Sequence, residues 1–258
     1  MIRELKIPNK KSLKLSAILS TPDDGNKFPL MLLLQGFLGK KEGEKLSSLS
    51  AHLLKLGVAS MRFDYSGYGQ SEGETEQEYL ISNFADDLDC VFNFLESQSD
   101  IDCSRLGVWG QSMGGMLAII LASTRPEIKI VCAVSSPAQI TIGDDLEKLV
   151  GLWKQNGYLE RKNSKGELVR ISYEFIDDAR KWNVLKLIKK IKVPLLIILG
   201  KKDGTVLPTT TRRIYKAANE PKQLVEIDDM PHDYKERPIF IEEINTISGN
   251  FAQKYLLA

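Results

Sequence analysis

The stretch that decides the fold is Leu106-Gly107-Val108-Trp109-Gly110-Gln111-Ser112-Met113-Gly114. An apolar run leads into the pattern Gly-x-Ser-x-Gly, and a run compatible with a helix, residues 115–122, follows it. The pattern predicts a strand that turns sharply into a helix with Ser112 at the apex. Glycine suits positions 110 and 114, because side chains there would collide across so tight a turn. Such a turn would lift the Ser112 hydroxyl clear of the sheet and aim the N–H of Met113 at the same space.

Buried strands and helices alternate along most of the chain. Continuous apolar runs predict strands at 30–34, 58–63, 130–134, 194–199 and 224–227. Apolar residues at helical spacing predict helices at 45–56, 81–95 and 239–257. The alternation indicates the α/β class: a mostly parallel, doubly wound sheet of about eight strands with helices on both faces. The alternating stretch Lys14–Leu19 predicts a half-buried strand at an antiparallel edge.

One segment interrupts this alternation, because no buried strand is predicted between Pro137 and Pro194. We therefore divide the chain into a core, residues 1–137 and 191–258, and an insertion, residues 138–190. The insertion holds a hairpin-like turn, Asn163–Gly166, and several aromatic residues: Trp153, Tyr158, Tyr173, Phe175 and Trp182. A long insertion after a sheet strand is either a cap over a functional site or a surface excursion. The aromatic residues fit both the apolar underside of a cap and a small core of the insertion itself.

Composition limits the classes of function. The 258 residues carry a net charge of +1 with Lys and Arg spread along the chain, so neither nucleic acid nor an anionic membrane surface is expected as a partner. The three cysteines are odd in number and sparse, which argues against a disulfide framework and fits a reducing compartment. The first residues lack the apolar region of a signal peptide, and no apolar run could span a bilayer, so we expect a cytoplasmic protein. The sequence does not determine the oligomeric state, and a homodimer is one of the alternatives.

The chemistry depends on a base for the serine. A serine hydroxyl is a poor nucleophile at neutral pH, so Ser112 needs a nearby base, and the base needs a carboxylate that orients it. The chain has only two histidines. His52 falls inside the predicted helix 45–56, where we expect a structural role. His232 lies in a loop just past the predicted strand 224–227, at the edge where active sites of parallel sheets gather, and is the expected base.

The orienting acid is expected at the end of another strand. Asp203 lies just past the predicted strand 194–199, although Asp-Gly is also a common turn pair. Asp144 and Asp145, which follow the predicted strand 130–134, are the alternative. The predicted catalytic residues therefore follow the chain order Ser112, Asp203, His232.

This order and several further stretches resemble the α/β-hydrolases. The stretches, together with the turn at Ser112, are Gln35–Gly39, Arg62–Gly73, Gly200–Val206 and Pro231–His232. The resemblance covers essentially the whole length of the chain. Within the superfamily, the chain is most similar to small bacterial carboxylesterases, including the cinnamoyl and feruloyl esterases. The resemblance therefore implies a serine carboxylesterase that acts on a small-molecule ester through an acyl-enzyme and needs no cofactor.

The resemblance also assigns roles around the predicted nucleophile. It implies that the backbone N–H groups of Phe37 and Met113 form an oxyanion hole, and that the Phe37 side chain faces the acyl pocket. Aromatic residues of the cap would bind substrate as well: Trp153, Tyr158 and Trp182. The chain departs from the family at Gln35, where members usually carry a histidine that braces the oxyanion loop. Glutamine can still hydrogen-bond through its amide N and O.

Other chemistries fit the sequence less well. The Gly-rich stretch Asp64–Gly73 lacks the Lys-Ser/Thr ending and the spacing of a phosphate loop, and we expect Asp64 and Ser71 to bind loop backbone there. Two histidines far apart make a poor metal site, so no metal is expected. Three alternatives stay open on the same scaffold: an amide or peptide hydrolase, an acyltransferase or lyase, and a non-catalytic binding protein.

Overall fold

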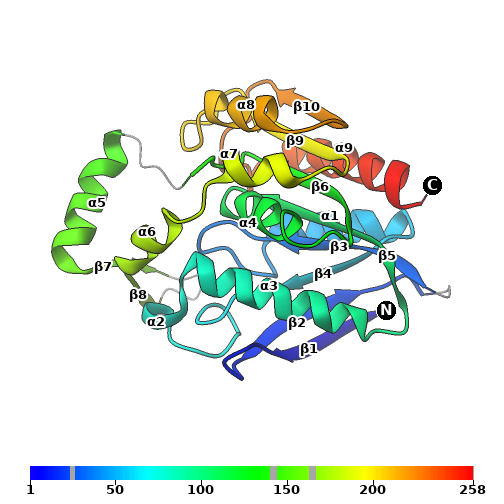
Figure 1. Cartoon of the computed structure of the whole chain (residues 1–258), viewed down its shortest axis with the longest axis horizontal. Coiled ribbons are helices and arrows are strands. Elements are labelled where there is room, and N and C mark those ends of the chain that lie inside the picture. Colours follow the sequence, from blue (N-terminus) through cyan, green and yellow to red (C-terminus); the bar gives the residue numbers. More distant parts are fainter. Residues whose placement is uncertain (24–26, 140–143, 163–166, 258) are drawn as a thin grey trace.

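The computed structural model describes residues 1–23, 27–139, 144–162 and 167–257 (Figure 1). Its centre is a sheet of eight strands in the order β1-β2-β4-β3-β5-β6-β9-β10. The strands are β1 (Ile2–Pro8), β2 (Lys14–Ser20), β3 (Phe28–Leu34), β4 (Ala59–Phe63), β5 (Ile101–Gln111), β6 (Ile128–Val134), β9 (Leu195–Gly200) and β10 (Lys222–Ile227). From β4 onward in this order the strands pair in parallel, and β1 and β2 form an antiparallel edge. The predicted fold class is confirmed.

Helices cover both faces of the sheet, because successive residues of each strand point to opposite faces. In β3, Leu30 and Leu32 belong to one apolar cluster, whereas Met31 and Leu33 belong to the other. The first cluster packs under α3 (Ile81–Glu96) and α4 (Met113–Ala122), which lie in front in Figure 1. The second packs under the paired helices α1 (Glu44–Lys55) and α9 (Pro238–Leu256), which lie behind. The remaining helices of the core are α2 (Thr75–Glu78) and α8 (Pro208–Ala217).

The insertion contains α5 (Asp144–Asn156), β7 (Tyr158–Lys162), β8 (Leu168–Ser172), α6 (Glu174–Ala179), α7 (Val184–Leu187) and a 3-10 turn, η1 (Ile188–Lys190). It lies partly beside the sheet: α5, β7, β8 and α6 are at the left of Figure 1, whereas α7 packs against α4 and α8 of the core. Strands β7 and β8 pair antiparallel, and the predicted turn Asn163–Gly166 between them lies outside the described residues. Trp153 is buried, and its indole N–H donates to the carbonyl of Ile171 at 2.9 Å. Trp153 and the other buried apolar residues of the insertion belong to the same apolar cluster as Leu30 and Leu32 of β3, so the core of the sheet continues into the insertion.

The parallel strands all end at the same edge of the sheet, and this edge carries the loops of interest. Ser112 follows β5, Phe37 follows β3, Asp203 follows β9 and His232 follows β10. Among the helices in the described parts of the chain, none combines the length and the apolar character that a membrane span needs.

Candidate active site

The turn at Ser112 has the geometry that its sequence predicted. Strand β5 ends at Gln111, helix α4 begins at Met113, and Ser112 between them has φ 57° and ψ −124°. The N–H of Ser112 donates to the carbonyl of Val134 at 2.8 Å, which ties the turn to the end of β6. A Cβ atom at Gly110 would lie 2.1 Å from the carbonyl oxygen of Gly114, so glycine is required there by close packing of the backbone.

His232 lies between Ser112 and Asp203 and contacts both. Its Nε2 is 3.0 Å from the Oγ of Ser112, and its Nδ1 is 2.8 Å from the Oδ2 of Asp203. The carbonyl of His232 also accepts a hydrogen bond from the side chain of Gln111, at 3.3 Å. The structure thus brings together three residues that are far apart in the sequence, in the arrangement of a nucleophile, a base and an orienting acid.

Asp203 is held in its ionised form. The side chain is buried, with 3% of the residue exposed. Its second oxygen, Oδ1, accepts hydrogen bonds from the N–H groups of Thr205 and Val206, at 2.9 and 2.7 Å. Burial by itself would raise the pKa of the carboxyl, but the hydrogen bond and charge of His232 and the Val206 N–H outweigh it and lower the pKa below its ordinary value. Asp203 is therefore a carboxylate at neutral pH.

The other histidine, His52, has a structural place in the fold. His52 packs in α1 against α9, where a Cβ atom at Gly249 would lie 2.6 Å from its Nε2. Burial, together with the charge of Lys55, lowers the pKa of His52, as expected for a structural histidine. The side chains of Asp144 and Asp145 lie outside the described residues.

The loop after β3 lies against the turn at Ser112 and is fixed by two tyrosines. A Cβ atom at Gly36 would lie 3.3 Å from the Cβ of Ser112. Two residues on, Leu38 has a positive φ of 54°, which is unfavourable for a residue with a side chain. Its N–H donates to the hydroxyl of Tyr79 at 2.6 Å, and its carbonyl accepts from the hydroxyl of Tyr68 at 3.1 Å. The sequence carried no signal for this clamp, because both tyrosines are distant in the chain.

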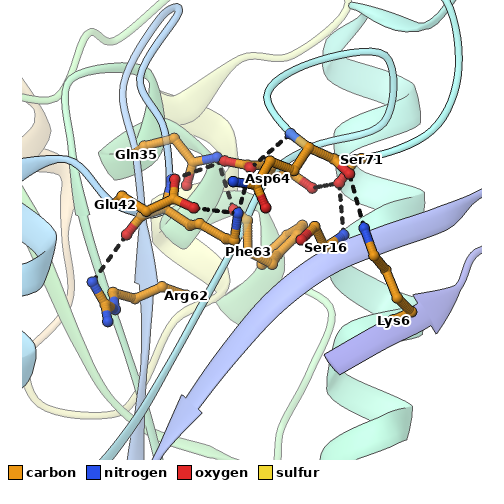
Figure 2. Close-up of polar contacts among 10 residues, drawn as sticks. Lys6, Ser16, Gln35, Glu42, Arg62, Phe63, Asp64 and Ser71 are labelled. Atoms are coloured by element: carbon orange, nitrogen blue, oxygen red, sulfur yellow. Dashed lines mark hydrogen bonds and ion pairs between the residues drawn. The ribbon is translucent and has the colours of Figure 1, made fainter. Parts of the chain in front are cut away.

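Behind the same loop lies a buried polar network, part of which Figure 2 shows. Gln35 donates from its side-chain amide to the carbonyl of Phe63 at 2.8 Å, which ties the start of the loop to β4. Asp64 accepts from both the N–H and the Nζ of Lys41, at 2.8 and 3.0 Å, and both side chains are almost fully buried. Ser71 donates to the carbonyl of Asp64 at 2.6 Å. The prediction that Asp64 and Ser71 bind loop backbone is confirmed.

A cavity of about 530 Å³ opens beside Ser112 and His232. Its walls come from the loop after β3, the first turn of α1 and the loop that carries His232. Its apolar lining includes three buried residues, Leu34, Leu46 and Trp109. Phe37 lines the cavity and is 39% exposed, so its side chain is available to a bound molecule.

The other aromatic residues that the sequence suggested for substrate binding are not among the residues that line this cavity. Trp153 stacks on Phe175 inside the insertion, with ring centroids 5.9 Å apart. Tyr158 lies under the guanidinium of Arg170, at 4.5 Å. Trp182 donates to the hydroxyl of Ser82 on α3, at 3.3 Å. These three side chains stabilise the insertion and its attachment to the core rather than the wall next to Ser112.

Comparison with known families agrees with this geometry. The pattern of the Hydrolase_4 family, described as "Serine aminopeptidase, S33", matches residues 30–165. The chain belongs to this family of α/β-hydrolases. The matched range holds the loop after β3, the turn at Ser112 and the first half of the insertion. The resemblance read from the sequence is confirmed at the level of this hydrolase fold.

Several proteins resemble this α/β-hydrolase over much of their length. An uncharacterized 31.7 kDa protein of Escherichia coli is 24% identical over 286 residues, which cover 96% of this chain and 98% of that protein. The human mitochondrial palmitoyl-protein thioesterase ABHD10 is 27% identical over 190 residues, which cover 70% of this chain and 58% of the thioesterase.

Solved structures show the same fold. The α/β-hydrolase GrgF of a Penicillium species superposes with a TM-score of 0.85 at 16% identity, with both chains covered completely. The protein Est1E of Butyrivibrio proteoclasticus, solved with ferulic acid bound, superposes with a TM-score of 0.80 at 20% identity, covering 98% of this chain and 99% of that one.

Proposed function

We propose that this protein hydrolyses carboxylic esters through an acyl-enzyme formed on Ser112. One observation carries the proposal: a single imidazole, that of His232, lies within hydrogen-bond distance of the Ser112 hydroxyl on one side and of the buried Asp203 carboxylate on the other. A serine that only packs in the core or faces solvent does not require hydrogen bonds to a histidine that is itself bound to a buried carboxylate. The arrangement supplies a nucleophile with a base and fixes the orientation of that base.

The reaction proceeds in two halves. The Oγ of Ser112 attacks the carbonyl carbon of the ester while the Nε2 of His232 takes the hydroxyl proton. As the C–O bond of the ester breaks, His232 gives this proton to the leaving alcohol, and the acyl group stays on Ser112. Water then loses a proton to His232, attacks the acyl carbon, and the proton returns to Ser112 as the acid leaves. Asp203, ionised because its pKa is lowered, accepts the Nδ1–H of His232 throughout.

Two backbone N–H groups stabilise the negative charge that develops on the carbonyl oxygen. The N–H of Met113 is the first of α4, and N–H groups in the first turn of a helix have no partner within the helix. The N–H of Phe37 is the second donor, in the loop that lies against Ser112. Each such donor is worth about 100- to 1,000-fold in turnover. The Tyr79 and Tyr68 contacts to Leu38 hold the Phe37 donor in position.

The insertion, residues 138–190, acts in this proposal as a cap whose contact with the site runs through Phe37. The Phe37 ring lies 5.4 Å from that of Phe175 in α6 and 5.6 Å from that of Tyr79. Because Phe37 also lines the cavity, it adds to the apolar wall of the acyl site. Trp153 contributes indirectly, since it stacks on Phe175.

Two related bonds are the second candidates. The family description, serine aminopeptidase, favours an amide bond, and the relative named a palmitoyl-protein thioesterase favours a thioester. Cleavage of each bond passes through a tetrahedral intermediate of the same kind, which differs only in the leaving atom, so the same catalytic groups serve all three.

The test uses one acyl group on three leaving groups: p-nitrophenyl butyrate, butyryl p-nitroanilide and an aryl butyryl thioester. We expect the ester to be hydrolysed faster than the anilide. Ser112→Ala should lose on the order of 10⁴-fold in kcat, whereas Ser97→Ala, at the exposed end of α3, serves as the matched control. Turnover of the anilide without turnover of the ester would refute ester hydrolysis and favour the amidase. Turnover that survives Ser112→Ala would refute the nucleophile.

A further inference from the structure

Positive charge surrounds the cavity beside Ser112. Three lysines line it: Lys40, Lys45 and Lys235. The carboxylates on the same walls are those of Glu44 and Asp233. These lysines and carboxylates together give the lining a net charge of +1, in a space whose other walls include buried apolar side chains.

The lysines outnumber the carboxylates that pair with them. Lys45 and Lys235 share a single partner, because their Nζ atoms lie 3.1 and 3.5 Å from the two oxygens of Asp233. Lys40 is half-buried, and among the residues that the structure describes it has no carboxylate within 4.0 Å. Glu44 is exposed at the start of α1 and forms no ion pair among the described residues either. The Lys40 ammonium is thus available to an incoming anion.

Lys45 is held in a fixed position at the same wall. Its side chain is only 18% exposed, and its Nζ lies 4.1 Å above the ring of the buried Tyr234. Burial lowers the pKa of Lys45 below its ordinary value, although the hydrogen bond to Asp233 opposes this. The partner carboxylate, that of Asp233, is 58% exposed, so this ion pair replaces only part of the hydration that the Lys45 ammonium loses on burial. A second anion beside it would improve this balance.

The first turn of α1 adds to the positive potential. Gly43, Glu44, Lys45 and Leu46 all line the cavity, and Gly43 at the N-cap offers no side chain that binds the free N–H groups. The N-terminus of a 12-residue helix carries a partial positive charge, of the same sign as the lysines.

We propose that substrates of this hydrolase carry an anionic group, a carboxylate or a phosphate, on the part that enters the cavity, and that Lys40 and Lys45 bind it. The proposal rests on the ester hydrolysis proposed above and names its substrate class. The apolar lining then contacts the carbon chain between the reacting carbonyl and the anion.

The test compares matched anionic and neutral esters. One pair varies the acyl group, mono-p-nitrophenyl adipate against p-nitrophenyl hexanoate. Two further comparisons vary the leaving group. The anionic esters are 4-acetoxybenzoate and 4-acetoxyphenyl phosphate, and the neutral ester for both is 4-acetoxybenzamide. In at least one comparison, we expect a kcat/KM ratio of anionic over neutral ester above 1. This ratio should fall about five-fold or more in Lys40→Gln and in Lys45→Met, and with added salt. The comparisons distinguish carboxylate from phosphate.

Lys129→Gln is the matched control, because Lys129 is exposed near the start of β6, at the opposite end of the strands. Ratios at or below 1 in all comparisons, or a ratio that Lys40→Gln leaves unchanged, would overturn the proposal. If no ester is hydrolysed, a measurement of anion binding tests the proposal separately. Adipate or inorganic phosphate should then stabilise Ser112→Ala against heat and lose this effect in Ser112→Ala with Lys40→Gln. Equal stabilisation of both variants would overturn anion binding independently of the reaction.

Discussion

Replacing Tyr79 by Phe is expected to weaken catalysis while leaving the fold intact. The substitution removes one oxygen atom, the hydroxyl that accepts the N–H of Leu38 at 2.6 Å. Tyr79 is 2% exposed, so water does not readily take the place of that oxygen. Leu38 has a positive φ, and without this contact the loop is expected to relax and to shift the neighbouring N–H of Phe37.

The magnitude follows from the hydrogen bond that is lost. A fully buried donor left without a partner costs about 1–3 kcal/mol, and this range is the upper limit for Leu38, whose bond to Tyr79 is partly buried. If that cost appears as a displaced oxyanion donor, kcat/KM falls roughly 5- to 150-fold, since about 1.4 kcal/mol corresponds to a factor of ten. Because the donor acts on charge that develops in the transition state, kcat should fall more than KM rises.

The assay is steady-state hydrolysis of p-nitrophenyl butyrate, with urea unfolding measured on the same preparations. Tyr65→Phe is the matched control, because Tyr65 is equally buried and its hydroxyl has no hydrogen-bond partner among the described residues. We expect Tyr65→Phe to keep the wild-type kcat. Wild-type kcat/KM in Tyr79→Phe, or an equal loss in Tyr65→Phe, would refute the positioning of the loop by Tyr79.

Three further outcomes follow from the site. Folding lowers the pKa of Asp203 below its ordinary value of 3.8. The charged carboxylate therefore stabilises the folded protein at pH values above 3.8, and this stabilisation is lost as the pH falls through the lower pKa of the folded state. Urea unfolding should therefore find Asp203→Asn less stable than wild type at pH 7, with a gap that narrows below about pH 4; a gap of constant size would contradict this. A Cβ atom at Gly114 would lie 2.2 Å from the carbonyl oxygen of Leu34, so Gly114→Ala should lose activity and about 1–3 kcal/mol of stability, whereas Gly151→Ala, in open space on α5, should lose neither. Burial raises the pKa of each cysteine, Cys90, Cys103 and Cys132, so iodoacetamide at neutral pH should leave turnover unchanged. Inactivation would instead point to a thiol nucleophile.

The sequence predicted those parts of the site that depend on short patterns. Gly110 and Gly114 around Ser112 identified the turn because backbone sterics require glycine within a few residues of the apex. His232 and Asp203 were predicted because each follows a recognisable apolar strand of a parallel sheet, although β10, before His232, is an edge strand in which only Ile227 is buried. Helix α8 was missed because it is mostly polar: only Thr211 and Ile214 in it are buried, so no apolar run marks it in the sequence.

Long-range contacts could not be predicted in this way. The clamp joins Leu38 to Tyr68 and Tyr79, which lie 30 and 41 positions further along the chain. No local sequence pattern indicates which tyrosine hydroxyl contacts which backbone group. The buried pair of Lys41 and Asp64 is similar, because a lysine in a loop is expected to be solvated unless the tertiary structure encloses it. The aromatic residues of the insertion indicated burial but not direction, so Trp153 could be assigned to a cap surface or to a small core with equal reason. In the structure it is buried on Phe175, in the apolar cluster that continues from the insertion to one face of the sheet.

The most direct test of the proposed nucleophile is its covalent capture. Wild-type protein is treated with diethyl p-nitrophenyl phosphate, and intact-mass and peptide mass spectrometry locate the adduct while p-nitrophenyl butyrate hydrolysis is followed in parallel. We predict one diethylphosphoryl group on Ser112, loss of turnover in proportion to labelling, and much slower labelling in His232→Ala. An adduct on another residue, or full turnover in protein that is fully labelled at Ser112, would contradict a Ser112 acyl-enzyme.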